Sequence, residues 1–413
     1  MKEIFKKVTC RVCTKKALKK VLTLGPTPLA NAFLTNKQIN EGEKFYPLDV
    51  YFCTKCGFLQ LGHVVSPRTL FGDYLYVSST SKVFIKHFEQ FAEKVFQRLN
   101  LSLDSFVIDI GSNDGILLKP FKELGTKVLG IEPADNIAKI AKSEGIDTVS
   151  EYFNKKLAHA IVKKYGKADV VTATNVFAHI DNLDEVIEGL KILLQDNGVF
   201  IIEAPYLIDL LQKRYFDLVY HEHLSYWSVD SLRTLFNRFG MTVFHVEKVP
   251  VHGGSIRVFI KRGKGKYAIE KSVKQFLQKE KSQKLHILQT YQIFAKKIIA
   301  NRLQLLKLLT KIKLQGKTIA GYGAPAKATT LMHYFKIGSD FVDYIVDDSP
   351  YKQNLYAPGT HIPVVSAKTL KINPPDYLLI LAWNFAESIM KTHQWYKEKG
   401  NKFILPVPRP RIV

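Results

Sequence analysis

Between residues 105 and 260, short apolar runs alternate with stretches whose apolar residues recur at helical spacing. Runs of this length fit buried strands, and their alternation with helices is typical of an α/β domain with a mostly parallel sheet. An amphipathic helix is expected ahead of them over residues 82–99, with its apolar face at Val83, Phe84, Phe88, Phe91, Val95 and Phe96. The runs lie at residues 106–110, 128–131, 169–173, 198–203, 242–249 and 256–260.

A second α/β pattern occupies the C-terminal part of the chain. Its apolar runs lie at residues 318–321, 341–346 and 377–381, and a helix is expected over residues 326–335. Residues 267–314 separate the two patterns and repeat apolar residues at helical spacing, so a helical connector with one buried face is expected. Residues that mark this face are Ile287, Tyr291, Phe294, Ile298 and Leu303.

The length of the chain supports a division into several domains. A chain of 413 residues exceeds what a single hydrophobic core usually serves. We expect a unit built around four cysteines at residues 1–75, an α/β domain at 76–262, a basic helical connector at 263–316 and a Rossmann-like α/β domain at 317–413.

The net charge of +23 matters mainly where the charge is concentrated. Residues 261–317 carry sixteen Lys and Arg residues against two acids. A helix with a lysine-rich solvent face accounts for this surplus, and attraction of anionic substrates is a second explanation. No nucleic-acid module is recognisable in the middle of the chain, so no nucleic-acid partner is expected.

The hydropathy of the chain indicates where the protein works. No apolar run reaches the roughly 20 residues that span a bilayer. The first seven residues lack the apolar core of a secretory signal. We expect a cytoplasmic protein that does not enter a membrane. Its oligomeric state stays open, with a monomer as one option.

All four cysteines fall into two Cys-x-x-Cys pairs, which is the pattern of a metal site rather than of disulfides. Each pair forms a knuckle that directs two thiolates at one point. Two knuckles complete a closed, tetrahedral zinc site of structural type. Redox-active cysteines are the alternative. The expected ligands are Cys10, Cys13, Cys53 and Cys56.

A glycine-containing turn, Gly111-Ser112-Asn113-Asp114-Gly115, follows the first central strand. Glycine lets the backbone approach a ligand closely. Glu132 ends the next strand, where an acid can accept both hydroxyls of an adenosine ribose. Because the turn lacks the Gly-x-Gly-x-x-Gly pattern, it favours a nucleoside cofactor that carries no phosphate and has a positive sulfonium.

Polar side chains also follow the later strands. Asn175 and His179 come after the strand at 169–173, where open α/β sheets bind ligands, although His179 alone fits a packed or capping residue equally well. The densest cluster is Tyr220-His221-Glu222-His223-Leu224-Ser225-Tyr226-Trp227. It favours general-base chemistry, because neutral histidine takes protons near pH 7. Metal binding and polar packing remain alternatives.

A second glycine turn, Gly321-Tyr322-Gly323-Ala324-Pro325-Ala326-Lys327, links a strand to a helix. With Asp347 and Asp348 after the next strand, it is a passable nicotinamide dinucleotide fingerprint. Backbone N–H groups and the Lys327 charge suit a phosphate equally well. We therefore regard the turn, including Tyr322 and Lys327, as a candidate site for the diphosphate of a nucleotide sugar.

Taken together, these motifs resemble the C-methyltransferases that act on nucleotide-linked 4-keto-6-deoxysugars. The string His221-Glu222-His223-Leu224-Ser225-Tyr226 is the most specific piece of the resemblance. The other pieces span the chain in the family's order: the two cysteine pairs, residues 73–81 (Asp-Tyr-Leu-Tyr-Val-Ser-Ser-Thr-Ser), residues 110–115, residues 252–257 (His-Gly-Gly-Ser-Ile-Arg) and residues 321–327.

The resemblance implies an N-terminal zinc domain, a central class I methyltransferase domain that binds S-adenosylmethionine, and a C-terminal Rossmann-like domain. It also implies methyl transfer to C3 of the sugar. By this likeness His223 is the base, with Tyr76, His179, Tyr220 and Glu222 around the sugar. Glu222 is expected to hold His223 in the right tautomer or to pair with its charged form. Ser79, Tyr322 and Lys327 are the expected contacts to the rest of the substrate. The cofactor residues are Gly111, Asn113, Asp114, Gly115, Glu132 and Asn175.

Two rival functions compete with this interpretation. A nicotinamide-dependent nucleotide-sugar oxidoreductase would use the turn at Gly321 and Gly323, but it leaves the first turn and Glu132 unexplained. A zinc-ribbon module that binds nucleic acid through its basic helix would make the cluster at 220–226 accidental.

Overall fold

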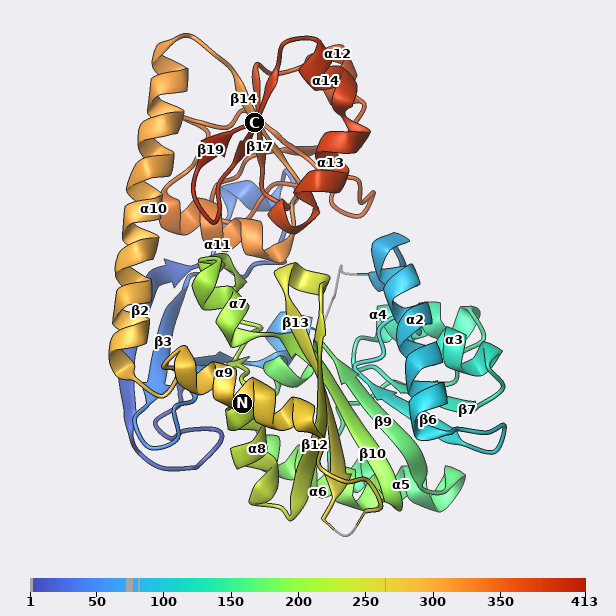
Figure 1. Cartoon of the computed structure of the whole chain (residues 1–413). Coiled ribbons are helices and arrows are strands. Elements are labelled where there is room, and N and C mark those ends of the chain that lie inside the picture. Colours follow the sequence, from blue (N-terminus) through green and yellow to red (C-terminus); the bar gives the residue numbers. More distant parts are fainter. Residues whose placement is uncertain (1–2, 72–76, 81, 264) are drawn as a thin grey trace.

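The structure is a computed structural model that describes residues 3–71, 77–80, 82–263 and 265–413. Two α/β domains lie at opposite ends of the molecule, and the long helix α10 (Leu288–Leu314) runs along one side from one to the other (Figure 1). An N-terminal β unit packs beside α10, and its strands contact elements of both domains.

The N-terminal unit contains a four-stranded antiparallel sheet in the order β11-β4-β3-β2. Strands β2 (Leu18–Thr27), β3 (Tyr46–Cys53) and β4 (Leu59–Leu61) come from the unit itself. The fourth strand, β11 (Ser225–Tyr226), belongs by sequence to the central domain. A separate pair joins β1 (Ile4–Lys6) to β5 (His63–Val65), and helix α1 (Pro67–Phe71) follows.

The central domain has a seven-stranded sheet in the order β12-β13-β10-β9-β6-β7-β8. Six strands run in the same direction and only β13, between β10 and β12, runs antiparallel to them, so the mostly parallel sheet is confirmed. The strands are β6 (Phe106–Ile110), β7 (Lys127–Ile131), β8 (Thr148–Val149), β9 (Ala168–Thr174), β10 (Leu194–Pro205), β12 (Met241–Val249) and β13 (Ser255–Arg262).

Helices cover both faces of this sheet because successive strand side chains point to opposite sides. Val107 of β6 packs with α2 and α3, whereas its neighbour Ile108 faces the cluster that contains α5, α6 and α8. Helix α2 has the expected bounds, but Val83 on its expected apolar face is exposed. The helices are α2 (Lys82–Leu99), α3 (Leu118–Glu123), α4 (Asp135–Ser143), α5 (Lys155–Tyr165), α6 (Leu183–Leu193), α7 (Leu207–Gln212) and α8 (Val229–Asn237).

The C-terminal domain has a six-stranded sheet in the order β16-β15-β14-β17-β18-β19. The expected strand at 341–346 is wrong over its first part, because Phe341 and Val342 turn back to the carbonyl of Gly338. Strands are β14 (Ile319–Tyr322), β15 (Ile345–Val346), β16 (Val364–Val365), β17 (Tyr377–Ile380), β18 (Lys402–Leu405) and β19 (Arg411–Ile412). Helices are α11 (Ala326–Phe335), α12 (Thr369–Ile372), α13 (Ala386–Thr392) and α14 (Gln394–Glu398).

The basic connector consists of two helices, α9 (Lys271–Ser282) and α10, rather than one. Tyr291, Phe294 and Ile298 are buried as expected, but Leu303 is 63% exposed. Five residues after Ile298, Leu303 falls on the opposite side of a helix with 3.6 residues per turn. Asn301 takes the buried position instead, and its Nδ2 donates to the Pro406 carbonyl over 3.0 Å.

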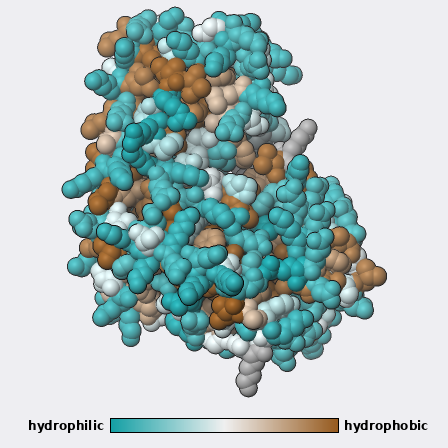
Figure 2. All heavy atoms as spheres, in the orientation of Figure 1, coloured by the Kyte–Doolittle hydropathy of each residue, from teal (hydrophilic) through white to brown (hydrophobic). Residues whose placement is uncertain are grey.

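The surface visible in Figure 2 is mostly hydrophilic, with hydrophobic patches toward the end that holds the C-terminal domain. In the part of the chain that the structure describes, no helix combines the length and the apolar character that crossing a membrane requires.

Candidate active site and metal centre

The two Cys-x-x-Cys pairs meet at one point in the N-terminal unit. The four Sγ atoms lie within 4.8 Å of one another, with 3.5 Å between Cys10 and Cys56 and 3.6 Å between Cys13 and Cys53. Tetrahedral zinc with Zn–S bonds of about 2.3 Å separates its sulfurs by about 3.8 Å. The four cysteines therefore fit zinc, and all four positions are filled by protein.

The first glycine turn lies at the carboxyl end of β6. Gly111 has φ +69°, and a Cβ there would lie 2.6 Å from Cγ2 of Val176, just after β9. Gly115 has φ +82° and packs against Ile146 in the same way. Because a Cβ would clash at both positions, glycine is what lets the turn approach Val176 and Ile146 this closely, as a cofactor cradle in an α/β sheet requires.

Glu132 stands at the end of β7 and points toward this turn. Its carboxylate accepts the backbone N–H of Asn113 over 3.0 Å and that of Ala134 over 2.9 Å. Burial raises the pKa of Glu132, and the two backbone hydrogen bonds oppose that rise. The acid is thus fixed by the backbone at the turn, where it can accept ribose hydroxyls.

Two buried oxygens at these strand ends bear on whether a cofactor fits. Asp114 Oδ1 and Asn175 Oδ1 accept no hydrogen bond from any residue that the structure describes. The other Asp114 oxygen accepts the N–H of Ser79 over 3.0 Å, and Asn113 Oδ1 accepts that of Ser78 over 2.9 Å. Since buried polar atoms almost always have partners, unpaired acceptors beside the turn fit the hydroxyl and amino donors of an adenosine cofactor.

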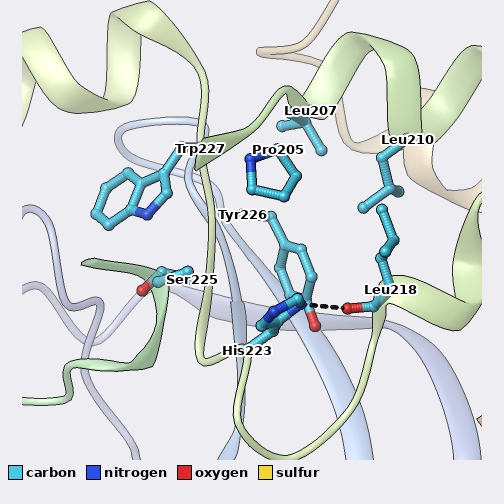
Figure 3. Close-up of a pocket in the computed structure, with 9 residues that line it drawn as sticks. Pro205, Leu207, Leu210, Leu218, His223, Ser225, Tyr226 and Trp227 are labelled. Atoms are coloured by element: carbon cyan, nitrogen blue, oxygen red, sulfur yellow. Dashed lines mark hydrogen bonds between the residues drawn. The ribbon is translucent and has the colours of Figure 1, made fainter. Parts of the chain in front are cut away.

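His223 and Tyr220 form a hydrogen-bonded pair. Nδ1 of His223 lies 2.7 Å from the Leu218 carbonyl (Figure 3), and Nε2 lies 2.8 Å from the Tyr220 hydroxyl. A carbonyl only accepts, so Nδ1 carries the proton and Nε2 is the basic nitrogen. Burial lowers the pKa of His223 to about 4. A small hollow lined by Leu210, Leu218, Tyr226 and Trp227, among others, adjoins the ring (Figure 3).

His179 completes an aromatic stack at this place. Its ring stacks on that of His223 with centroids 5.1 Å apart and on that of Phe71 at 5.7 Å. Burial, and then the nearby His223, hold its pKa well below the ordinary value. Its Nε2 is buried and has no partner among the described residues. The structure therefore brings His179, Tyr220 and His223 together.

Glu222 does not orient His223 through a ring nitrogen, which corrects our expectation. Nδ1 of His223 bonds to the Leu218 carbonyl, and Nε2 bonds to the Tyr220 hydroxyl. Glu222 instead turns toward the N-terminal unit, where its Oε1 accepts from Nδ2 of Asn31 over 2.6 Å. The physical reason is that adjacent residues of this loop point to different sides. Tyr76 lies outside the described residues.

The expected substrate residues lie in different parts of the fold, with Ser79 before α2 and Tyr322 and Lys327 in the C-terminal domain. Ser79 is exposed and holds Asp114 through its backbone. The Tyr322 hydroxyl donates to Asp348 and accepts from His393 at 2.9 Å. Nζ of Lys327 donates to Asn384 and lies 3.5 Å above the Trp383 ring.

The acid after β15 closes the second glycine turn from within. Asp347 accepts the N–H of Ala324, in the turn itself, over 2.6 Å and that of Ser349 over 2.9 Å. In a dinucleotide site such turn N–H groups face the pyrophosphate. Asp347 therefore occupies a donor that the oxidoreductase alternative needs.

Two groups of buried polar residues escaped the sequence interpretation. Glu203, which ends an apolar run, lies between Arg257, at 2.8 Å, and His87, at 2.6 Å. Asp217 accepts from Nε1 of Trp383 over 2.5 Å. For Glu203, an acid at the end of an apolar run was the sequence signal that could have predicted a buried ion pair. For Asp217, nothing nearby in the sequence indicated that Trp383 would be its partner.

Three family models match consecutive parts of the chain: a zinc binding domain at residues 10–71, a methyltransferase domain at 84–246 and a C-methyltransferase C-terminal domain at 250–408. Residues 321–327 thus belong to a methyltransferase, and the oxidoreductase alternative loses its basis.

Similar proteins agree with these matches. The chain is 36% identical over 404 residues to C-methyltransferase NovU from Streptomyces niveus, which covers 98% of this chain and 96% of that one. A ubiquinone biosynthesis O-methyltransferase from Pelagibacter ubique is 26% identical over 121 residues, covering 29% of this chain and 50% of the relative.

Among solved structures, the magnesium protoporphyrin IX methyltransferase of Synechocystis with bound S-adenosylmethionine is 16% identical and covers 47% of this chain and 88% of that one, with a TM-score of 0.34. That score is too low to carry an argument. The relation to NovU, by contrast, extends over nearly the whole of both chains and includes the cysteine unit, the cofactor turn and the C-terminal domain. This chain therefore belongs to the C-methyltransferase family, as an S-adenosylmethionine-dependent enzyme with an N-terminal zinc-binding domain.

Proposed function

We propose that the enzyme methylates C3 of a nucleotide-linked 4-keto-6-deoxysugar through an enolate. The observation that carries the proposal is the stack of His179 on His223, with Tyr220 bonded to the basic nitrogen. Methyl transfer to carbon needs a carbon nucleophile, and a ketone provides one by acidifying the hydrogen on its neighbouring carbon. A neutral base beside a donor suits that step.

His223 accepts the C3 proton at Nε2 in this proposal. The depressed pKa keeps the ring neutral at pH 7, so the nitrogen is free of a proton when substrate arrives. The Leu218 carbonyl fixes the tautomer and stabilises the imidazolium once it forms. Tyr220 competes as the base, because its hydroxyl stands at the same nitrogen.

His179 and Tyr220 stabilise the enolate oxygen at C4. The unpartnered Nε2 of His179 is a donor in one neutral tautomer. Tyr220 can turn its hydroxyl from His223 to the oxygen as charge develops, and stabilisation of that charge is usually the largest catalytic contribution. S-adenosylmethionine, when bound, supplies the electrophilic methyl group.

Lys327 and Tyr322 are proposed to act on the nucleotide end of the substrate, and Ser79 near the sugar. Lys327 lies at the start of α11, where burial lowers its pKa to about 7 and the neighbouring Asp217 opposes that fall. A cation at a helix N-terminus favours a diphosphate. Among the described residues, Tyr322 and Lys327 hydrogen-bond to Asp348, His393 and Asn384 rather than to His179 or His223.

A panel of nucleotide 4-keto-6-deoxysugars, with dTDP and GDP among the nucleotides, tests the proposal by mass spectrometry after incubation with S-adenosylmethionine. We expect one sugar to gain a single methyl group, which nuclear magnetic resonance should place at C3. Transfer of the methyl group to an oxygen would contradict the proposal. So would methylation of a 4-hydroxy analogue when none of the keto sugars reacts. Incubation with NADH in place of the methyl donor is the control for reduction.

A further inference from the structure

Arg11 lies between the two cysteines of the first pair, yet its side chain points away from the sulfurs into the protein. The side chain has 0% exposure, which is unusual for arginine. Such burial requires specific partners for the guanidinium group.

The guanidinium group joins three segments of the chain. Nε donates to Oδ1 of Asp181 over 2.9 Å, while Nη1 lies 2.8 Å from the carbonyl of Leu61 and 3.3 Å from that of Leu224. The second oxygen of Asp181 accepts from Lys7 over 3.0 Å. One rigid, planar group therefore sets the distance between a carboxylate and two backbone carbonyls.

Two of these partners adjoin the histidine stack. Asp181 follows His179 by two residues, and Leu224 follows His223 directly. The backbone supports the same arrangement, since Leu224 also accepts the N–H of Leu61 over 2.9 Å and β11 pairs with β4 from Ser225 onward. The segments that carry His179 and His223 thus meet at the zinc knuckle.

We propose that Arg11 is a positioning residue that fixes His179 and His223 relative to each other, so that the zinc-bound knuckle sets the geometry of the reacting groups. The inference rests on the proposed function of these histidines. It assigns the zinc unit a part in turnover, through Arg11, in addition to stability.

The test compares Arg11→Met, Arg11→Lys and Asp181→Asn with a matched control, Arg238→Met. Arg238 also binds the first knuckle, at the Val12 carbonyl over 2.6 Å, and an acid, Asp184 at 2.8 Å. Among the described residues, Arg238 hydrogen-bonds to neither Asp181 nor Leu224. Zinc content, affinity for S-adenosylmethionine by calorimetry and the melting temperature show whether each full-length variant is intact.

The decisive readout is nuclear magnetic resonance of histidine rings labelled with ¹⁵N. For Arg11→Met we expect full zinc content and unchanged cofactor affinity, with displaced signals of His179 and His223 and a pKa of His223 that rises toward the ordinary value. Asp181→Asn should displace mainly the His179 signal. Arg11→Lys should displace the two histidine signals less than Arg11→Met does, because an ammonium keeps the charge but cannot span three partners. Arg238→Met should leave both signals in place.

Turnover provides a second readout with the sugar that reacts in the panel. Because a misplacement of about 1 Å can cost about 100-fold, we expect kcat to fall about 10- to 100-fold in Arg11→Met, with KM for the methyl donor unchanged. Histidine signals identical to those of the wild type in zinc-loaded Arg11→Met would overturn the inference. If His223→Asn kept full turnover instead, the assignment of His223 as the base would fail, while the ring signals of the Arg11 variants would still test the role of Arg11. If Arg11→Met does not fold, Arg11→Lys and Asp181→Asn decide by the same signals.

Discussion

His223 shows how surroundings rather than residue type decide what a side chain can do. The Leu218 carbonyl selects the tautomer, burial lowers the pKa to about 4, and Tyr220 covers the basic nitrogen. Of His179, His221 and His223, the rings of His179 and His223 stack on each other. His221 turns to the N-terminal unit, where Nε2 contacts the Tyr46 carbonyl over 3.1 Å.

His223→Asn keeps a polar side chain of similar shape but removes the basic nitrogen. We expect turnover to fall about 10²–10⁴-fold, the usual contribution of a positioned base, while both ligands still bind. Exchange of the C3 hydrogen of the keto sugar in deuterated water, without methyl donor, measures proton removal directly. Exchange at the wild-type rate in His223→Asn, together with its loss in Tyr220→Phe or His179→Asn, would move the role to one of those residues.

Acidification should destabilise the fold through the buried histidines. Burial lowers the pKa of both His221 and His223 to about 4 from the ordinary 6.5. Between these values the unfolded chain binds more protons, so the free energy of unfolding is highest above pH 6.5 and declines as the pH falls toward 4. Urea unfolding at pH 7.5, 6 and 5 should show this decline, and it should be shallower in His221→Gln. An equal slope in that variant would argue against a share for His221.

At the scale of elements, two connections form the candidate cofactor turn and the cysteine cluster. The turn after β6 depends on Gly111 and Gly115, where a side chain would strike the neighbouring segment. The zinc knuckles depend on hairpin ends that bring four sulfurs within 4.8 Å. Both are local sequence motifs whose backbone geometry determines what they bind.

Glu132→Ala should weaken binding of S-adenosylmethionine while the fold is retained. The loss removes a charged acceptor for the ribose hydroxyls, which corresponds to about 1–3 kcal/mol. Calorimetry gives the affinity, and Glu144→Ala, an exposed acid on the same domain, is a suitable control. Equal affinity in Glu132→Ala and the wild type would show that another residue binds the ribose.

Loss of one zinc ligand should affect stability before chemistry. Cys13→Ser removes a thiolate from a closed site, and structural zinc affinity is coupled to folding. We expect less zinc by elemental analysis and a lower melting temperature or insoluble protein, whereas the wild type should hold one zinc per chain. A wild-type protein that contains no zinc and is nevertheless fully stable would refute a structural role for the metal.

In the molecule as a whole, the C-terminal domain docks on the loop that carries the histidines. Thr330 of α11 donates to the Val219 carbonyl, directly before Tyr220, over 3.0 Å, and Thr329 donates to the Ala30 carbonyl over 3.0 Å. Trp383 reaches Asp217 from the same domain. The site therefore forms only where three parts of the chain meet.

Lys327→Ala should raise KM for the nucleotide sugar and leave affinity for S-adenosylmethionine unchanged. A contact far from the reacting carbon contributes equally to the ground and transition states, so kcat should change little. The variant also leaves buried Asp217 without its cation, and Lys327→Ala/Asp217→Asn is the control that removes this stability effect. A selective loss of cofactor affinity would reassign Lys327 to the adenosine ligand.

Much of this protein follows from its sequence because the informative features are local. The period of apolar residues predicted α2 and α11 with the bounds observed, and strands β6, β7 and β9 to within one residue at each end, since buried faces repeat at the spacing of their element. Cysteine spacing predicted the metal cluster, because two residues between thiolates suffice to form a knuckle. The glycine turn and Glu132 follow from the order of strands in a parallel sheet.

Tertiary structure decided what depends on residues distant in the chain. Ser225 and Tyr226 became an edge strand of the zinc unit, although their sequence belongs to the central domain. Glu222 bonded to Asn31 rather than to its neighbour His223, and Lys327 came to lie beside Trp383 and Asn384. The spacing of apolar residues in the sequence shows which face of an element is buried, but it does not show which residue lies across an interface from that face. Hydrogen-bond geometry at these contacts therefore settled which polar groups became the chemical site.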